Sequence, residues 1–295
     1  MIRNVDIVRP RDLEQALDMR AELGEQGLPV AGGTDVIVEL RGQRISGKTL
    51  VDLSRVEALK GITEGDDGIL VGALTTHEEA SGSALLLDRA TALAQACGEV
   101  GSLQIRNRGT LGGNVANASP CADGLTALIG LAGIALVAST TGEREVSVED
   151  LIERPYRTGL GPDEIIVGFR IPRSAAGARS HFVKLGRRDA LAISRINAAC
   201  LIETDGATVS ACQLAVGSVM PRTERVREAE AAVEGAPASG ETARLAGEAV
   251  SRRMIEMSGV RWSTPYKEPA VGAVVKRAVL GAMGLGDETT GAGLI

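Results

Sequence analysis

Two short glycine-rich segments constrain the fold of this chain more than any other feature. The first, Pro29 to Val36, passes from an apolar stretch through two glycines to a hydroxyl and a carboxylate. The second, Gln104 to Asp123, combines paired glycines with a threonine, an asparagine and an aspartate. Successive glycines let backbone N–H groups turn towards an anion without a Cβ that blocks its approach. Two such segments therefore predict a binding site for the two phosphates of a diphosphate.

Either segment alone is a weak signal. The chain has 37 glycines, so several Gly-Gly turns without function are expected. Glycine commonly does no more than permit a turn. The two segments together, with Asp123 at the end of the second, are harder to explain by turn formation, and we treat them as one candidate site.

Composition excludes several functional classes. The 295 residues, 44% of them hydrophobic, suffice for two or three domains with their own cores. A net charge of -6 with interspersed signs argues against a nucleic-acid partner, and 2% aromatic residues leave few platforms for stacking bases. The longest weakly polar run, Leu125 to Ala138, is too short to span a membrane. Met1 to Pro10 has no apolar signal region, so a cytoplasmic location is expected.

The cysteines and histidines predict neither a metal site nor a catalytic group. Cys97, Cys121, Cys200 and Cys212 are scattered without a C-x-x-C pair, and only His77 and His181 could assist them. We expect small buried thiols in a reducing compartment. Thr76 and Glu79 form a capping box around His77, which assigns that histidine to a helix start.

The chain divides into three expected regions, residues 1–57, 58–173 and 180–285, with a flexible linker from Arg173 to Arg179. The first region predicts helices at 12–24 and 36–41 and strands at 28–31 and 49–53. The second predicts a hairpin over 61–71, helices at 86–100 and 125–132, and strands at 134–139 and 164–171. The third predicts three antiparallel strands, 181–185, 196–204 and 208–215, then helices at 223–234, 240–257 and 269–283.

The order of these motifs resembles the FAD-binding subunit of the molybdenum hydroxylases, such as bacterial xanthine, nicotinate and carbon monoxide dehydrogenases. The family's Ala-Gly-Gly-Thr-Asp stands at Ala31 to Asp35, and its Ile-Arg-Asn-x-Gly-Thr-x-Gly-Gly-Asn at Ile105 to Asn114. The resemblance extends over essentially the whole chain. Further matches are Ala122-Asp123, Glu164 to Ile166, Phe182 to Arg188, and Tyr266-Lys267, where the family usually has Tyr-Arg.

The resemblance implies an α+β fold. It has a two-part, vanillyl-alcohol-oxidase-like (PCMH-type) FAD-binding domain and a small C-terminal domain with a three-stranded antiparallel sheet and helices. It implies FAD as the cofactor of this chain. It also implies a heterotrimer, with a molybdopterin-binding large subunit and a small subunit that carries [2Fe-2S] clusters. Electrons would pass from those clusters through FAD to an acceptor such as NAD+.

The resemblance also implies which residues bind the cofactor, and none of them is catalytic or a metal ligand. Asp123 is expected near the flavin, or as a helix cap, and Lys184 near the flavin carbonyls, or as an ordinary strand lysine. Leu191 and Ile193 are candidates to cover one flavin face, although core packing explains them equally well. The expected set is Pro29, Val30, Ala31, Gly32, Gly33, Thr34, Asp35, Val36, Gly101, Gly109, Thr110, Gly112, Gly113, Asn114, Asn117, Ala122, Asp123, Ile165, Ile166 and Lys184.

Two alternatives remain at the level of sequence. A regulatory or assembly module could hold a nucleotide diphosphate without catalysis. A Rossmann dehydrogenase would need G-x-G-x-x-G directly after the first strand of a parallel unit, and neither glycine segment has that spacing. The substrate of the complex leaves no mark on this chain.

Overall fold

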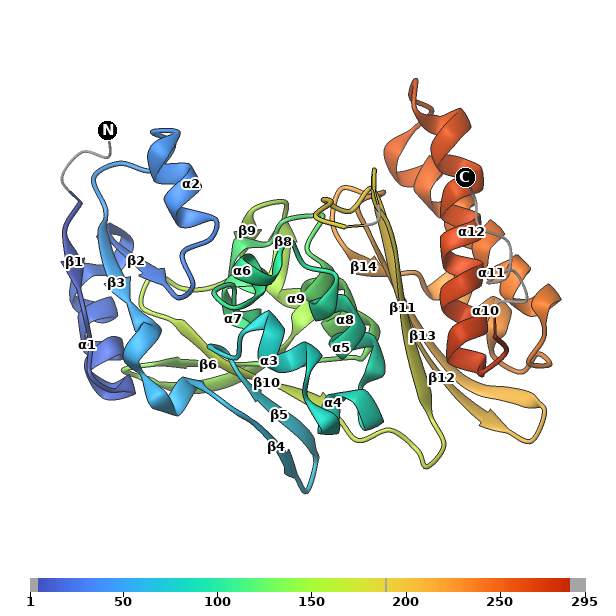
Figure 1. The fold of residues 1–295 in the computed structure, drawn as a ribbon, viewed down its shortest axis with the longest axis horizontal. Helices are drawn as coiled ribbons and strands as arrows, with labels where there is room; N and C mark the ends of the chain where they lie inside the picture. The colour runs from blue at the N-terminus through green and yellow to red at the C-terminus, as the bar shows by residue number, and fades with distance from the viewer. Residues whose placement is uncertain (1–4, 189, 287–295) are drawn as a thin grey trace.

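Residues 5–188 and 190–286 are described by a computed structural model, which forms three neighbouring bodies (Figure 1). The N-terminal body is a parallel three-stranded sheet in the order β1-β3-β2. Parallel strands require helical crossovers, and the chain supplies one before β2 and one before β3. Its elements are β1 (Ile7–Val8), α1 (Leu13–Leu23), β2 (Gly27–Val30), α2 (Val36–Arg41) and β3 (Thr49–Asp52).

The first helix begins and ends where the sequence predicts. The Asp12 carboxylate accepts the Gln15 N–H at 2.9 Å, as an N-cap does. Gly24 ends the helix with φ +48, a conformation in which glycine has no Cβ penalty.

The central body is a five-stranded antiparallel sheet in the order β4-β5-β10-β6-β7, with helices on one side. The predicted hairpin over 61–71 is confirmed as β4 and β5. The strands are β4 (Ile62–Gly65), β5 (Gly68–Gly72), β6 (Ile134–Ser139), β7 (Gly142–Ser147), β8 (Ile152–Arg154), β9 (Arg157–Thr158) and β10 (Ile165–Pro172), of which β8 and β9 form a separate pair. The helices are α3 (His77–Ser81), α4 (Ala84–Arg89), α5 (Thr91–Gly98), α6 (Leu103–Arg106), α7 (Leu111–Asn117), α8 (Asp123–Gly130) and α9 (Val148–Leu151).

The C-terminal sheet has four antiparallel strands, so the prediction of three is wrong. The missed strand is the two-residue β14, which pairs with the end of β13. It occupies the beginning of the predicted 223–234 helix, which therefore starts later. The elements are β11 (Arg179–Leu185), β12 (Ile196–Asp205), β13 (Thr208–Gly217), β14 (Glu224–Arg225), α10 (Arg227–Val233), α11 (Gly240–Ser258) and α12 (Thr264–Met283).

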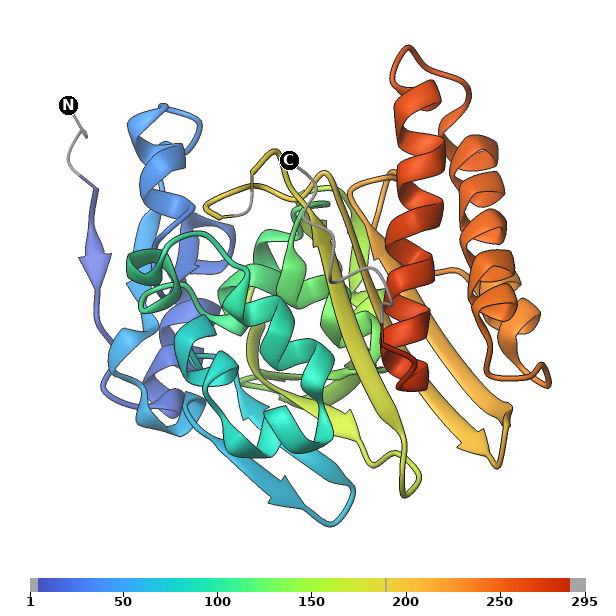
Figure 2. The ribbon, with the colours of Figure 1, turned by 45° about the vertical axis from the view of Figure 1, so that its right-hand side comes forward.

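The C-terminal sheet is a middle layer, covered on both faces. Along β12, Ala199 and Leu201 join the hydrophobic core of the central body, whereas Ala198, Cys200 and Ile202 join the core under α10, α11 and α12. Side chains alternate between the two faces of a strand, which explains why β12 is apolar at consecutive positions. Figure 2 shows α11 and α12 side by side on the outer side of this sheet.

Three local predictions in the helical segments need correction. The predicted 86–100 helix is two helices, because Ala90 between them has φ -142 and ψ 48. The last helix begins at Thr264 and carries Pro269 inside it. The second glycine segment, expected as a loop, contains the helix α7. In the described residues, no helix combines the length and apolar character needed to cross a bilayer.

Candidate functional site

The first glycine segment lies between the end of β2 and the start of α2, and its backbone donors are free. Gly33 has φ +73 and its carbonyl accepts the Ile37 N–H at 3.1 Å. Within residues 5–188 and 190–286, the N–H groups of Gly32, Gly33 and Thr34 have no hydrogen-bond acceptor. Half-buried N–H groups without acceptors favour an external anion, because an unpaired polar group is costly.

The fold brings the two glycine segments into contact. A Cβ at Gly32 would lie 1.8 Å from the carbonyl oxygen of Arg108. A Cβ at Gly109 would lie 3.6 Å from the Thr34 hydroxyl oxygen. Glycine is therefore required at position 32 because the backbone of the second segment packs directly against it. The sequence prediction that both segments form one site is consistent with this contact.

The second segment differs from the prediction in how it uses its own backbone donors. Thr110 caps α7, and Gly112 allows the helix to approach Ala73, whose Cβ and carbonyl oxygen would each lie 2.7 Å from an added Cβ. Four N–H groups at the start of α7 donate within the chain: Leu111 to Thr75 O (3.0 Å), Gly112 to Ala73 O (2.8 Å), Gly113 to Thr110 Oγ1 (3.1 Å) and Asn114 to Thr110 O (2.9 Å). A ligand can reach these donors only by replacing such partners, so the open backbone donors are those of the first segment.

A buried pair, His77 and Cys97, contacts the second segment. The backbone N–H of His77 donates to the Gly109 carbonyl oxygen at 3.0 Å, and the ring Nδ1 of His77 lies 3.5 Å from Cys97 Sγ. Burial, assisted by the Arg106 charge, lowers the pKa of His77 to about 4. Burial, and then the Asp123 charge, raises the pKa of the Cys97 thiol. Both groups are therefore neutral, and one proton is shared in the contact between Nδ1 and Sγ, with the donor set by the tautomer of the ring.

Asp123 lies at the centre of a buried polar cluster that joins α8 to the C-terminal sheet. It is 5% exposed and is the first residue of α8, where it makes no capping hydrogen bond. The Asn114 side chain instead accepts the Leu125 N–H at 2.9 Å. The Asp123 carboxylate accepts from Lys184 Nζ (2.7 Å), Ser194 Oγ (2.5 Å) and Asn197 Nδ2 (2.7 Å).

The cluster also fixes Lys184, whose Nζ donates to the Glu99 carbonyl oxygen at 2.7 Å. A buried carboxylate and ammonium compensate each other, and the extra donors satisfy the remaining lone pairs. Sequence reasoning missed Ser194 and Asn197. They lie 71 and 74 positions from Asp123, so only the tertiary fold reveals them.

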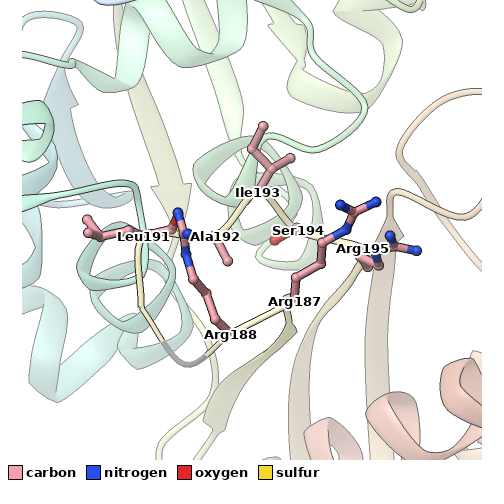
Figure 3. A pocket seen from close by; sticks show the side chains of 7 residues that line it. All are labelled: Arg187, Arg188, Leu191, Ala192, Ile193, Ser194 and Arg195. Atoms are coloured by element: carbon pink, nitrogen blue, oxygen red, sulfur yellow. The ribbon is translucent and has the colours of Figure 1, made fainter.

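Residues between β11 and β12 line a cavity of about 540 Å³. Leu191 and Ile193 are 54% and 79% exposed, so core packing does not explain them. Figure 3 shows their side chains directed away from each other across the loop. The residues that line the cavity are Arg187, Arg188, Leu191, Ala192, Ile193, Ser194 and Arg195.

The remaining predicted residues fall into two groups. Pro29 and Val30 end β2, Gly101 turns the chain before α6 with φ +49, and Asn117 ends α7. Ile165 and Ile166, by contrast, begin β10, and their side chains are buried in two different hydrophobic clusters. Asp35 lies at the surface, where partial desolvation of its carboxyl, and then the Glu39 charge, raise the pKa of that carboxyl.

Comparison with known families identifies the chain. Residues 3–174 match the FAD binding domain in molybdopterin dehydrogenase, and residues 181–282 match the CO dehydrogenase flavoprotein C-terminal domain. The chain belongs to this flavoprotein family. It is an FAD-binding medium subunit of the molybdopterin-dependent dehydrogenases, of xanthine, nicotinate and carbon monoxide dehydrogenase type.

Several relatives of this FAD-binding subunit match along nearly their whole length. The nicotinate dehydrogenase FAD-subunit of Eubacterium barkeri is 29% identical over 283 residues, covering 94% of this chain and 95% of the relative. The xanthine dehydrogenase FAD-binding subunit of Escherichia coli O157:H7 is 29% identical, with 92% and 93% covered. A solved carbon monoxide dehydrogenase from Hydrogenophaga pseudoflava superposes with a TM-score of 0.90 at 26% identity, covering 97% of this chain and 100% of that chain.

The residues of the site fit a dinucleotide cofactor. Three free backbone donors in a glycine segment suit a diphosphate, and a Cβ at Gly32 would disrupt the segment. In the part of the chain that the structure describes, no group of three or more His, Cys, Asp and Glu side chains is arranged to hold a metal ion.

Proposed function

We propose that this chain holds FAD between its two glycine segments and relays electrons from [2Fe-2S] clusters on a partner subunit to an acceptor such as NAD+. The observation that carries the proposal is the free N–H triplet of Gly32, Gly33 and Thr34, packed against Arg108 and Gly109 of the second family motif. When bound, the flavin supplies the redox chemistry, because it exchanges electrons singly and in pairs.

The chain's own residues bind and orient the cofactor in this proposal. The first segment donates its N–H groups to the diphosphate, and the second keeps that segment in shape. Lys184 uses two of its three N–H bonds on Asp123 and Glu99, and we assign the third to the flavin ring. A fixed ammonium there stabilises negative charge that develops on the ring. Leu191 and Ile193 remain candidates to shield one ring face.

The partners are inferred from the relatives. Two relatives are named as a carbon monoxide dehydrogenase medium chain and a nicotine 6-hydroxylase medium subunit. The word "medium" implies that each complex also has a larger and a smaller chain. We infer a molybdopterin-binding large subunit and a [2Fe-2S] small subunit for this chain too. The four cysteines are free thiols, which supports a cytoplasmic, reducing environment.

The proposal is tested by co-expressing the chain with its genomic neighbours and measuring the cofactor. Gel filtration should yield one assembly of three kinds of chain, and mass spectrometry of the released cofactor should identify FAD. A stable chain that binds neither partners nor added FAD would instead support the non-catalytic nucleotide module.

A further inference from the structure

Two buried polar side chains, Thr126 and Asn197, lie behind Asp123 and do not belong to the predicted cofactor contacts. Thr126 on α8 and Asn197 on β12 are each 0% exposed, and the Thr126 hydroxyl donates to Asn197 Oδ1 at 3.0 Å. The Asn197 amide in turn donates Nδ2 to Asp123 Oδ1 at 2.7 Å. Buried polar groups are costly unless they are hydrogen-bonded, so each of these two side chains depends on the other.

The direction of these hydrogen bonds follows from the charge at one end. An ionised carboxylate only accepts hydrogen bonds, so Asn197 must turn Nδ2 towards Asp123 and Oδ1 towards Thr126. A threonine hydroxyl has a single proton to donate. The second neighbour of this hydroxyl, Ala122 O at 3.1 Å, already accepts the Thr126 N–H at 3.1 Å. The proton is therefore available to Asn197, and the three side chains form a one-way chain that ends on Asp123.

A glycine on the neighbouring strand leaves the space for this chain of hydrogen bonds. Gly217 on β13 stands opposite Asn197 in the register of the two strands. A Cβ at Gly217 would overlap Asn197 Oδ1 and would lie 2.6 Å from Thr126 Oγ1. Any other residue at position 217 would displace the amide or the hydroxyl, because a close-packed interior has no spare room. Three elements, α8, β12 and β13, therefore fix the orientation of the Asn197 amide.

Asn197 and Lys184 act on opposite oxygens of the Asp123 carboxylate. Lys184 Nζ donates to Oδ2 at 2.7 Å, whereas Asn197 and Ser194 donate to Oδ1. Donors on both oxygens fix the plane of the carboxylate and stabilise its charge. The carboxylate then fixes the Lys184 ammonium, whose side chain is 7% exposed.

We propose that Asn197, held by Thr126, is a positioning residue that sets the reduction potential of the flavin through Asp123 and Lys184. The inference rests on the proposed function, because it takes the third N–H of Lys184 to face the flavin ring. Neither Thr126 nor Asn197 touches the cofactor or takes part in electron transfer.

The sign of the effect follows from the charges. Without the Thr126 hydroxyl, the Asn197 amide is free to turn, and the Asp123 carboxylate loses a donor. Its negative charge is then less delocalised, and it draws the Lys184 ammonium towards itself. Both changes disfavour the reduced flavin, on which negative charge develops, so the reduction potential falls.

The test measures the flavin midpoint potential of the FAD-containing complex by equilibration with redox dyes. Thr126→Val removes the hydroxyl and keeps the branched shape of the side chain, whereas Thr126→Ser keeps the hydroxyl. We expect the redox equilibrium of Thr126→Val to shift about tenfold towards oxidised flavin, as for loss of a hydrogen bond to a charged group. That shift corresponds to a potential about 30 mV lower for a two-electron couple. Thr126→Ser should have the potential of the unsubstituted complex.

Thr91→Val is the matched control, because the Thr91 hydroxyl donates to the carbonyl oxygen four residues earlier, Leu87 O, at 3.0 Å. Its complex should keep the unsubstituted potential. If Thr126→Val does not fold, Thr126→Ala takes its place, since it removes the same hydroxyl without adding a methyl group.

Three results would overturn the inference. The first is an equal potential in Thr126→Val and the unsubstituted complex, both with FAD bound, which would leave the pair as a structural contact even if stability falls. The second is a lowered potential that Thr126→Ser also shows or that Thr91→Val shares. The third is loss of FAD from both Thr126→Val and Thr126→Ala, which would assign the hydroxyl to cofactor binding. Absence of FAD from the unsubstituted complex would instead contradict the proposed function.

Discussion

At the scale of single residues, Gly32 has the least room for change. An added Cβ would lie 1.8 Å from a backbone oxygen, which cannot rotate away as a side chain could. We expect Gly32→Ala to separate the two glycine segments, lower the unfolding free energy by about 1–3 kcal/mol and abolish FAD retention. Gly240→Ala is the control, because a Cβ there meets nothing within 4 Å. Denaturant unfolding and FAD content measure both effects, and full FAD content in Gly32→Ala would refute the tight contact.

His77 makes a second residue-scale prediction, on acid stability. Its folded pKa of about 4 is below the ordinary histidine value of 6.5, so the unfolded chain takes up a proton first as pH falls. Stability from neutral His77 is complete above pH 6.5 and is lost between pH 6.5 and about 4. The loss approaches about 3 kcal/mol.

Unfolding measured at several pH values should show this component in the natural protein and not in His77→Gln. NMR titration provides an independent measurement, because the His77 ring should remain neutral through the pH range in which an exposed histidine titrates. A normal titration of His77 in the folded protein would contradict the buried neutral pair.

At the scale of elements, the Asp123 cluster ties α8 to β11 and β12. Removing one partner of a buried ion pair leaves an uncompensated charge, which costs about 3–5 kcal/mol. We expect Asp123→Asn and Lys184→Met each to destabilise the protein strongly, and the double variant to lose less than the sum of the two. A double-mutant cycle in denaturant measures the coupling.

The exposed Lys60–Glu57 pair, with side chains 41% and 80% exposed, is the control for this cycle. Pairs of that kind contribute at most about 1 kcal/mol. Additive losses at Asp123 and Lys184 would mean that the two groups are not coupled across the domain contact.

The sequence predicts elements well where the signal is local and poorly where the partner is distant. The Asp12 cap, the Thr76–Glu79 capping box and the apolar run of β6 lie within a few residues of the elements they define. Strand β14 has only two residues and exists because it pairs with β13. Helix α7 contains two glycines of low helix propensity, and its first two N–H groups donate to the carbonyl oxygens of Thr75 and Ala73.

The candidate site shows the same limit. The glycine segments can be recognised in the sequence because paired glycines indicate a backbone that other residues cannot easily adopt. The sequence does not reveal which of the two segments keeps open N–H donors, since this depends on which N–H groups already have acceptors in the folded chain.

At the scale of the whole molecule, the C-terminal sheet belongs to two cores at once. The hydrophobic core of the central body includes four residues of this sheet, Phe182, Ala199, Leu201 and Ala215. The two bodies on either side of the 173–179 linker therefore share one core. A Cβ at Gly130 of α8 would lie 2.7 Å from Ala199 O of β12, which marks how closely the two bodies approach. We keep residues 1–57, 58–173 and 180–285 as proposed domains, because the three larger sheets divide among them. The polar cluster around Asp123 lies where the central body meets the C-terminal sheet.

The central claim is that electrons enter this chain from an iron–sulfur partner and leave through its flavin. The most direct measurement mixes the reduced [2Fe-2S] subunit with the FAD-containing chain without oxygen, and follows the cluster by electron paramagnetic resonance and the flavin by absorbance. The account predicts that the cluster signal decays as the flavin band bleaches, and that Gly32→Ala, which lacks flavin, leaves the clusters reduced. Clusters that stay reduced beside an oxidised flavin in an intact complex would contradict it.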